Sequence, residues 1–411
     1  MKILKVIFGL PGFAGDSPQM FSIIKNLQDL GHEVTIVTTD ADIFFYDEEK
    51  SKKYSDIRKK LSKSTEKLIE VNGVMIYPVH CITPKMGMYC LGAGKFAKKI
   101  VKNYDVIHIY NWYHHLGMVF SKVAYEKGIP FIISAYGSLQ EKARTIKIKK
   151  KLFADFLYTK KMIPHASALH SVGDLETIEY IKLGGDPKKI YRIDHGIDLE
   201  NFQIKEHTAI FKKLGINENN QPYLLFIGRI DKKKGLDLLL HAFANLNNTI
   251  KNLILVIAGS GAKEYEKEVK KLVNKLKIKN SVKFAGFVTE NEKLELLKYA
   301  KLFVLTSYSD VHPIAVQDSL AMGLPVLITK ACDYPEVAEY KAGIIVDENI
   351  DSVYEGLIKV LADEDQLRIF SENTKKLIKE KFLLKNIIKK YELMYFEALK
   401  NSWWYKQMNK K

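Results

Sequence analysis

The sequence is poor in cysteine and contains no pattern typical of a metal site. Cys81, Cys90 and Cys332 are the only cysteines among 411 residues, and neither a CxxC motif nor a Cys/His cluster accompanies them. An odd number of cysteines cannot complete a disulfide framework, which argues against a disulfide-rich secreted domain. The spacing also argues against a structural zinc site. We therefore expect a protein of a reducing compartment.

Long apolar runs are absent as well. A membrane-spanning helix needs about 20 consecutive apolar residues, and no segment approaches that length. The start, MKILKVIFGL, has the lysine and apolar run of a short signal peptide, but Pro11 and Gly12 end the run at strand length. No small-residue cleavage site is evident. We therefore expect a buried first strand and a cytoplasmic protein, with peripheral attachment to the membrane as an alternative.

Acidic residues are fewer than basic ones, and the net charge is +16. Such a charge favours anionic partners, namely nucleic acid, acidic lipids or phosphorylated ligands. In the stretch 142–161, eight lysines and arginines are interleaved with leucine and phenylalanine. This pattern is typical of a basic amphipathic helix on an anionic membrane surface. A solvated helix face in a lysine-rich chain explains it equally well.

Short apolar segments alternate with helical patterns from the start of the chain. The first strand, KILKVIFG, is followed by the glycine-containing loop LPGFAGD. Ser17 is a good N-cap and Pro18 suits the first helical position, while Gly31 suits a left-handed C-cap after Leu30. A second apolar strand, HEVTIVTT, follows. The order predicts a βαβ unit of a parallel, doubly wound sheet.

The same alternation predicts two α/β domains of similar size. A polar stretch at 203–221 separates the first series of strands from a second, which starts at YLLFIGR and continues through LILVIAGSG, VKFAGF, LFVLTS, PVLIT and GIIV. We place the N-terminal domain at 1–205 and the C-terminal domain at 206–385. A C-terminal helix and tail occupy 386–411, for which a return to the first domain is one alternative.

Three loops that follow strands in the second half contain small or basic residues. Ligands of parallel sheets bind at this edge. Arg229 and Lys234 lie in GRIDKKKG and suit a diphosphate, although a solvated basic turn has the same appearance. The loop AGSG at 258–261 permits close approach of a ligand or of backbone. Main-chain groups near Gly286 and Val288 suit the edge of a nucleobase, or an ordinary strand end.

A fourth loop carries two carboxylates eight positions apart, Asp310 and Asp318. Asp310 follows the strand LFVLTS, and Asp318 lies in the helix that comes next. A carboxylate there can accept hydrogen bonds from vicinal ribose hydroxyls, and the helix N-terminus favours a negatively charged ligand.

The ordered set of motifs resembles the C-terminal domain of family-4 retaining glycosyltransferases, which have the GT-B fold. The set is GR-x4-KG, AGSG, F-x-G, the acid pair, GLPV and PE, over about residues 222–350. The N-terminal half is similar more loosely, through Gly15, the DVIH strand and a Gly-Ile-Asp turn at 196–198. The family usually has glutamate at both acidic positions, a glycine pair at 14–15 and a His-Gly pair near residue 136. This chain has aspartates, Ala-Gly and Tyr-Gly there.

The resemblance implies two Rossmann-like, doubly wound domains facing a central cleft. It implies a retaining enzyme that moves a hexose-type sugar from a nucleotide-diphosphate sugar to a glycan, lipid or other acceptor. It also implies roles for particular residues: diphosphate binding by Arg229, Lys234, Gly12 and Gly15; ribose and nucleobase binding by Asp318, Gly286 and Val288; and catalysis by Asp310, near the transferred sugar, with His108. For His108, a core histidine is an equal alternative.

No cofactor and no obligatory metal are expected, because the cations of the GR-x4-KG loop would offset the diphosphate charge. His114 and His115 lie on one strand-end loop, but no third metal ligand is apparent. Two alternatives remain: a GT-B epimerase acting on a nucleotide sugar, and a non-catalytic basic nucleic-acid-binding protein. Paired acids in a phosphate site argue against the second, so no nucleic-acid partner is expected.

Overall fold

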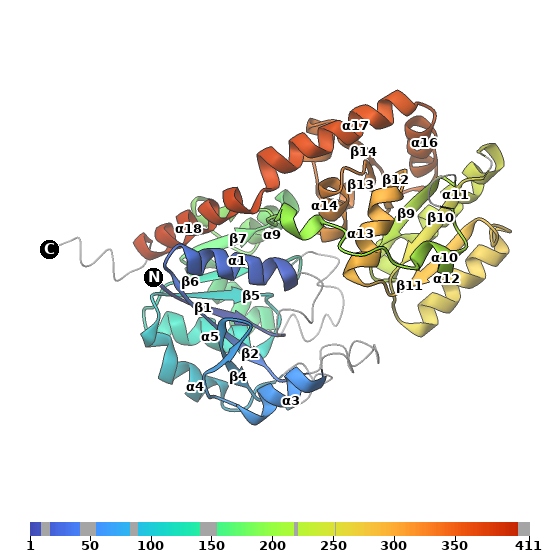
Figure 1. Cartoon of the computed structure of the whole chain (residues 1–411). Helices are drawn as coiled ribbons and strands as arrows, with labels where there is room; N and C mark the ends of the chain where they lie inside the picture. Colours follow the sequence, from blue (N-terminus) through green and yellow to red (C-terminus); the bar gives the residue numbers. More distant parts are fainter. Residues whose placement is uncertain are drawn as a thin grey trace. The chain divides into compact units, whose positions relative to one another are not determined.

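The computed structural model describes residues 1–9, 17–41, 55–82, 89–139, 154–217, 221–250 and 252–401. The chain forms two compact units (Figure 1). Unit 1 comprises Met1–Gly196 and Leu384–Lys411, and unit 2 comprises Ile197–Leu383. The division falls after residue 196 and again after residue 383, whereas the composition of the sequence suggested 205 and 385.

Unit 1 is built on an eight-stranded sheet with the strand order β3-β4-β2-β1-β5-β6-β7-β8. Only the β3–β4 pair is antiparallel among these strands. The strands are β1 (Lys2–Ile7), β2 (Glu33–Thr39), β3 (Ile69–Val71), β4 (Val74–Val79), β5 (Val106–Tyr110), β6 (Phe131–Ser134), β7 (Ala168–Ser171) and β8 (Ile190–Arg192).

Helices cover both faces of this sheet. Alternate residues of a strand point to opposite faces, and apolar residues on each face pack against helices. Leu4 and Val6 of β1 share a core with α4 and α5, whereas Ile3 and Ile7 share one with α1 and α18. The helices are α1 (Ser17–Asp29), α3 (Ser55–Lys63), α4 (Ala93–Ile100), η1 (Val101–Asn103), α5 (His115–Glu126), η2 (Asp155–Thr159), α8 (Lys160–His165), α9 (Asp174–Lys182), η3 (Pro187–Lys189) and α18 (Leu384–Lys400).

Unit 2 has a six-stranded, wholly parallel sheet with the order β11-β10-β9-β12-β13-β14. The strands are β9 (Tyr223–Ile227), β10 (Ile254–Ala258), β11 (Val282–Gly286), β12 (Leu302–Leu305), β13 (Val326–Thr329) and β14 (Gly343–Val346). The chain winds outward from β9 in one direction and from β12 in the other. The crevice between these two strands is therefore the topological switch point, where doubly wound sheets bind ligands.

The helices of unit 2 precede β9, connect successive strands, and follow β14. They are η4 (Leu199–Phe202), α10 (Ile210–Leu214), η5 (Lys232–Lys234), α11 (Leu236–Thr249), α12 (Lys263–Lys275), α13 (Glu290–Tyr299), α14 (Ile314–Ala321), η6 (Lys330–Cys332), α15 (Glu336–Glu339), α16 (Ile350–Leu361), α17 (Glu364–Leu377) and η7 (Ile378–Phe382).

The structure confirms the predicted fold class of two α/β units with doubly wound sheets. The predicted first helix begins at Ser17, and Gly31 has the left-handed conformation (φ 81°) expected of a C-cap. Within the described residues, every helix is too short or too polar to cross a bilayer.

Candidate functional site

The loops after β9 and β10 are held together by their backbones. Gly228 N donates to Ala258 O (3.0 Å), and Ile230 N donates to Ser260 O (3.0 Å). A Cβ atom on Gly259 would lie 1.8 Å from Gly228 O, and one on Gly261 would lie 1.9 Å from the carbonyl of Ile230. The glycines of AGSG are therefore required for the close approach of backbone, which was one of the two roles expected for them.

Gly235 joins the loop after β9 to the loop after β12. It has φ 63°, and a Cβ atom there would lie 1.8 Å from Thr306 O. The Thr306 hydroxyl donates to Gly235 O (2.7 Å), and Tyr308 N donates to Lys233 O (2.8 Å). These contacts place the side chains of the KKK turn next to the loop that carries Asp310.

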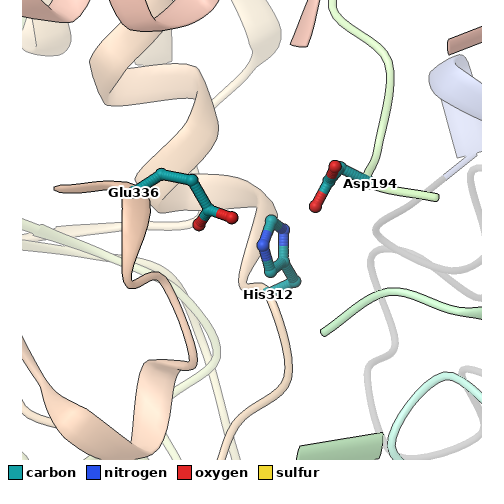
Figure 2. A group of neighbouring side chains, drawn as sticks. All are labelled: Asp194, His312 and Glu336. Carbon is teal, nitrogen blue, oxygen red and sulfur yellow. The ribbon is translucent and has the colours of Figure 1, made fainter. Parts of the chain in front are cut away.

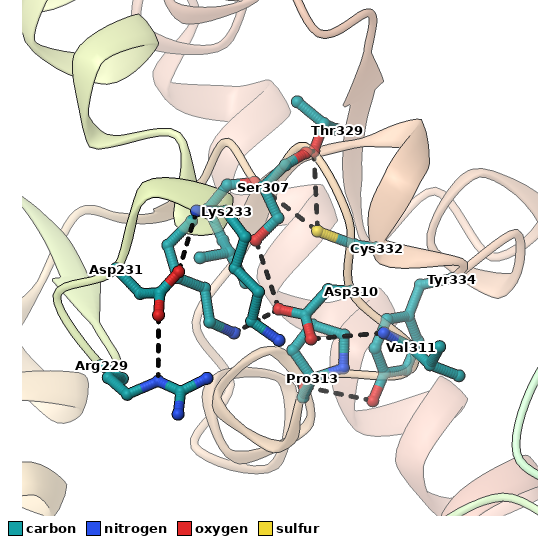
Figure 3. A network of polar contacts seen from close by, with 12 residues as sticks. Arg229, Asp231, Lys233, Ser307, Asp310, Val311, Pro313, Thr329, Cys332 and Tyr334 are labelled. Carbon is teal, nitrogen blue, oxygen red and sulfur yellow. Dashed lines mark hydrogen bonds and ion pairs between the residues drawn. The ribbon is translucent and has the colours of Figure 1, made fainter. Parts of the chain in front are cut away.

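Asp310 and Lys234 form an ion pair at this junction. Figure 3 shows the polar contacts that surround Asp310. Their side chains are 11% and 13% exposed, so water screens the pair only partly. Asp310 also accepts hydrogen bonds from the Ser307 hydroxyl (3.2 Å) and from Val311 N (3.2 Å). The two predicted site residues are thus brought together, which their separation in the sequence did not reveal.

Two further cations adjoin this pair. Burial lowers the pKa of Lys233, an effect that Asp310 opposes and that Lys234 and Arg229 reinforce. The Arg229 side chain is 50% exposed, and its Nε lies 3.7 Å from Asp231 Oδ2. Asp231 itself caps η5 by accepting a hydrogen bond from Lys233 N (3.0 Å). The loop therefore concentrates positive charge at the switch point.

Asp318 lies in α14, 5% exposed, and accepts a hydrogen bond from Lys293 Nζ (2.7 Å). Burial raises the pKa of Asp318, and Lys293 opposes that rise. Although burial lowers the pKa of Lys293, Asp318 and Glu290 together hold it above its ordinary value. Sequence reasoning missed Lys293, because a lysine within a helix carries no local signal of what it contacts.

The third predicted contact region, the end of β11, precedes α13. Gly286 is exposed with φ 72°, and its carbonyl accepts a hydrogen bond from Gly259 N (2.7 Å). Val288 is half-buried and stands just before Thr289, whose side chain and Glu292 form a capping box at the start of α13. Since Lys293 lies one turn further along α13, this helix connects the β11 loop to Asp318.

The loop after β12 also pairs with the loop after β13. Asp310 N donates to Ala331 O (3.0 Å), and His312 N donates to Cys332 O (3.2 Å). His312 is fully buried with φ 48°, and its ring lies 3.7 Å from that of Tyr334. Figure 2 shows its imidazole beside the carboxylate of Glu336. A non-glycine residue in this conformation costs about 1–3 kcal/mol, and such strain concentrates at functional sites. Sequence reasoning assigned no role to His312.

In unit 1, His108 occupies the core. Its Nδ1 is 2.8 Å from the Tyr395 hydroxyl, its Nε2 is 2.6 Å from the Ser134 hydroxyl, and burial holds its pKa well below the ordinary value. These are the surroundings expected of a core histidine, the alternative to the catalytic role. The other two predicted positions in unit 1, Gly12 and Gly15, lie outside the described residues.

The histidine pair after β5 serves the start of α5. His114 Nδ1 accepts a hydrogen bond from Gly117 N (3.0 Å), and Nε2 lies 2.8 Å from Tyr110 O, so both ring nitrogens are engaged. His115 Nδ1 accepts a hydrogen bond from Cys90 N (3.3 Å). Helix capping therefore accounts for His114 without a metal.

Fold and site together define an α/β protein whose second unit gathers cations and carboxylates at the carboxyl edge of a doubly wound sheet. Two family models match consecutive parts of the chain. Glycosyltransferase Family 4 matches residues 18–201, and Glycosyl transferases group 1 matches residues 206–377. The chain therefore belongs to the group 1 glycosyltransferases and is a glycosyltransferase of the GT-B fold.

Known proteins support this assignment. An uncharacterized glycosyltransferase of Methanocaldococcus jannaschii is 25% identical over 391 residues, 90% of each chain. An alpha-monoglucosyldiacylglycerol synthase of Streptococcus pneumoniae is 28% identical over 56% of this chain and 53% of that protein. The structure of Anabaena HepE in complex with UDP-glucose has the same fold, with a TM-score of 0.71 at 17% identity over 96% of this chain and 99% of that one.

Proposed function

We propose that the chain is a retaining glycosyltransferase that moves a hexose-type sugar from a nucleotide-diphosphate sugar to a glycan or lipid acceptor. The observation that carries the proposal is the Lys234–Asp310 ion pair at the switch point of unit 2, with Arg229 and Lys233 beside it. A cation already held next to a carboxylate at this edge can exchange that partner for a phosphate. The HepE complex with UDP-glucose supports the choice of donor class.

The chemistry follows from the charges that change during transfer. When the bond between the anomeric carbon and the diphosphate breaks, its electron pair moves to the leaving oxygen, so negative charge grows there and positive charge grows on the sugar. Arg229 and Lys234 would stabilise the negative charge on the leaving oxygen. The Asp310 carboxylate would stabilise the positive charge on the sugar. Asp318 would accept hydrogen bonds from ribose, remote from the bond that breaks.

A donor screen tests the proposal directly. The purified chain is mixed with UDP-, GDP- or ADP-glucose, and binding is scored by thermal shift. We expect one donor class to raise the melting temperature, and we expect nucleotide release to require an acceptor. Donor consumption without acceptor, with a changed sugar configuration, would instead indicate an epimerase. NMR of the first-formed product should show the anomeric configuration of the donor.

The cation loop offers a matched pair of variants. Lys234→Ala should lower kcat/KM about 100-fold, because a hydrogen bond to a charged group contributes about 1.5–3 kcal/mol and the leaving group gains charge in the transition state. Lys232→Ala is the control: this side chain is on the same turn, is 74% exposed and pairs with Glu268 at 3.3 Å. Equal kinetics for the two variants would contradict the assignment.

Metal independence is part of the proposal, since side-chain cations would take the place of a divalent ion. Activity should persist in excess EDTA. A strict requirement for added manganese or magnesium would show that the cations of the loop do not suffice for the diphosphate.

We also propose that 142–161 contacts an anionic membrane surface. Residues 154–161 of this stretch are described, and Phe156 and Leu157 are 78% and 44% exposed. The Thr159 hydroxyl accepts a hydrogen bond from Trp112 Nε1 (2.7 Å), which ties the segment to the body of unit 1. The glycolipid synthase among the relatives supports a lipid acceptor.

Liposome sedimentation tests the membrane contact. Binding to vesicles of anionic lipid should weaken as salt rises, and changing Lys149, Lys150 and Lys151 to serine should reduce it. Unchanged binding by the triple variant would assign the stretch to a solvated helix face.

A further inference from the structure

Two of the three cysteines face each other in unit 1. Cys81 follows β4, Cys90 stands shortly before α4, and the two residues form an isolated antiparallel bridge. Ile82 N donates to Tyr89 O (3.1 Å), which identifies the bridge as a non-hydrogen-bonded pair. The Cα atoms of such pairs are about 4.5 Å apart, which lies within the range that a disulfide spans.

Neighbouring side chains fix the backbone on both sides of this bridge. Asp40, at the end of β2, accepts a hydrogen bond from Cys81 N at Oδ1 (2.8 Å). On the other side, Cys90 N donates to His115 Nδ1 (3.3 Å), and the His115 ring packs at 4.0 Å on that of Tyr89. The two cysteines are therefore held opposite each other by contacts to the end of β2 and to the start of α5.

The thiols contact each other in a buried setting. Cys81 and Cys90 are 6% and 1% exposed. The hydrogen bond between the Cys90 thiol and Cys81, followed by burial, raises the pKa of the Cys90 thiol. The third cysteine, Cys332, belongs to the core of unit 2, so the pairing within unit 1 is unambiguous.

We propose that Cys81 and Cys90 are a reversible disulfide site that joins the end of β4 to the start of α4. The oxidant is a small-molecule disulfide such as oxidised glutathione. The Cys81 thiolate attacks one of its sulfurs and releases one small thiolate; the Cys90 thiolate then attacks the mixed disulfide at Cys81 and releases the second. Two electrons pass to the small molecule, and the two protons lost by the cysteines go to the released thiolates.

Two properties of the bridge follow from its position. The reaction should be slow at neutral pH and faster at higher pH, because the buried thiols must ionise first. The bond closes a short loop, residues 82–89, and restricts the unfolded chain, so oxidation should stabilise unit 1.

Oxidation of the full chain, followed by mass spectrometry, tests the site. The reduced protein is unfolded and refolded in a glutathione redox buffer at pH 8.5, and remaining thiols are alkylated in denaturant. We expect a peptide cross-linked between Cys81 and Cys90, alkylation at Cys332, and a melting temperature raised by about 5 °C that dithiothreitol reverses. Separate alkylation or glutathionylation of Cys81 and Cys90 after refolding would overturn the proposal.

The variants Cys81→Ser and Cys90→Ser serve as controls. Each should lose the response of the melting temperature to oxidised glutathione. A rise that persists in either variant would place the stabilising oxidation elsewhere and overturn the assignment. The cross-linked peptide from the parent chain decides the question even where a serine variant folds poorly.

Discussion

Two sets of buried ionisable groups, one in each unit, have different kinds of partner. In unit 1, Lys5 and His108 lie within the sheet core and have neutral hydrogen-bond partners, Tyr110 and Ser134 among them. In unit 2, Lys234 and Lys293 lie at the carboxyl edge of the sheet and are paired with carboxylates. A neutral network supports packing, whereas an ion pair at a ligand-binding edge can be exchanged for a charged ligand. We therefore expect the first set to be structural and the second to take part in ligand binding.

The polar core of unit 1 is a chain of hydrogen bonds on one side of the sheet. Lys5 Nζ donates to the Tyr110 hydroxyl (2.9 Å), and the Ser134 hydroxyl contacts both His108 and His170 at 2.6 Å. Burial lowers the pKa of Lys5 to about 7 and that of His170 to about 3. The groups of this core are therefore favoured in their uncharged forms.

The largest expected effect tests whether the edge of unit 2 depends on its backbone geometry. Gly235→Ala should destabilise unit 2 by about 4 kcal/mol, because the new Cβ would meet the carbonyl of Thr306 at 1.8 Å and the backbone would be strained at φ 63°. Gly286→Ala is the control, with a similar φ of 72° but no atom within 4 Å of the Cβ position. It should cost about 1 kcal/mol. Hydrogen exchange, followed separately for each unit, measures the destabilisation caused by each variant. Equal destabilisation by the two variants would show that the contact between Gly235 and the Thr306 carbonyl does not stabilise unit 2.

Much of this edge could be predicted from the sequence, because the signals are local. Alternating apolar strands and helices indicate a parallel sheet, and the loops after strands then lie at one edge. Arg229, Lys234 and Asp310 were found in this way. The pairing of Lys234 with Asp310 was not, since it depends on Gly235 approaching Thr306, 71 positions further along the chain.

The polar core of unit 1 could not be predicted either, because its contacts join residues that are far apart in the sequence. KILKVIFG indicates a buried strand, but nothing local shows that Lys5 is enclosed by tyrosines from β5 and α18. His108 was equally compatible with core and catalytic roles. Its partner Tyr395 is 287 positions away, and only the folded chain brings the two together. Lys293 escaped notice because its partner Asp318 lies on a different helix.

The second prediction tests the neutral core of unit 1. The folded chain holds the pKa of Lys5 at about 7, below the ordinary value of 10.5, so the unfolded chain binds more protons between these values. The free energy of unfolding must therefore rise with pH from about 7 to 10.5. Below about pH 7, burial of the charged Lys5 lowers the free energy of unfolding by its full amount. Lys5→Met should stabilise the protein by about 3 kcal/mol at pH 6 and by little near pH 10.

Urea unfolding at a series of pH values measures this effect. Lys2→Met, on the same strand, is the control because the Lys2 side chain is 55% exposed. If the free energy of unfolding has the same pH dependence in Lys5→Met and Lys2→Met, Lys5 is charged in the folded protein. The contrast between a neutral core in unit 1 and ion pairs in unit 2 would then be wrong.

The third prediction concerns the exchange of partners at Lys234. In the absence of ligand, Asp310 neutralises this lysine, so a diphosphate must compete with the carboxylate. Asp310→Asn should therefore bind UDP about tenfold more tightly while transferring sugar more slowly. Titration calorimetry and initial rates measure the two effects. Weaker UDP binding by Asp310→Asn would mean that Asp310 holds Lys234 in place for the ligand rather than competing with it.

The smallest expected effect concerns Lys293, which opposes the protonation of a buried carboxylate. Burial already raises the pKa of Asp318, and Lys293 opposes the rise through Oδ2 (2.7 Å). Lys293→Met should raise that pKa further, so that Asp318 takes up a proton at a higher pH and becomes a weaker acceptor for ribose hydroxyls. UDP affinity should fall about fivefold near neutral pH and further as the pH decreases. Lys293→Arg should retain most of the affinity, and Lys298→Met, exposed on the same helix, should retain all of it. Calorimetric Kd values across the pH range decide the matter, because a merely structural lysine would leave the pH dependence of UDP binding unchanged.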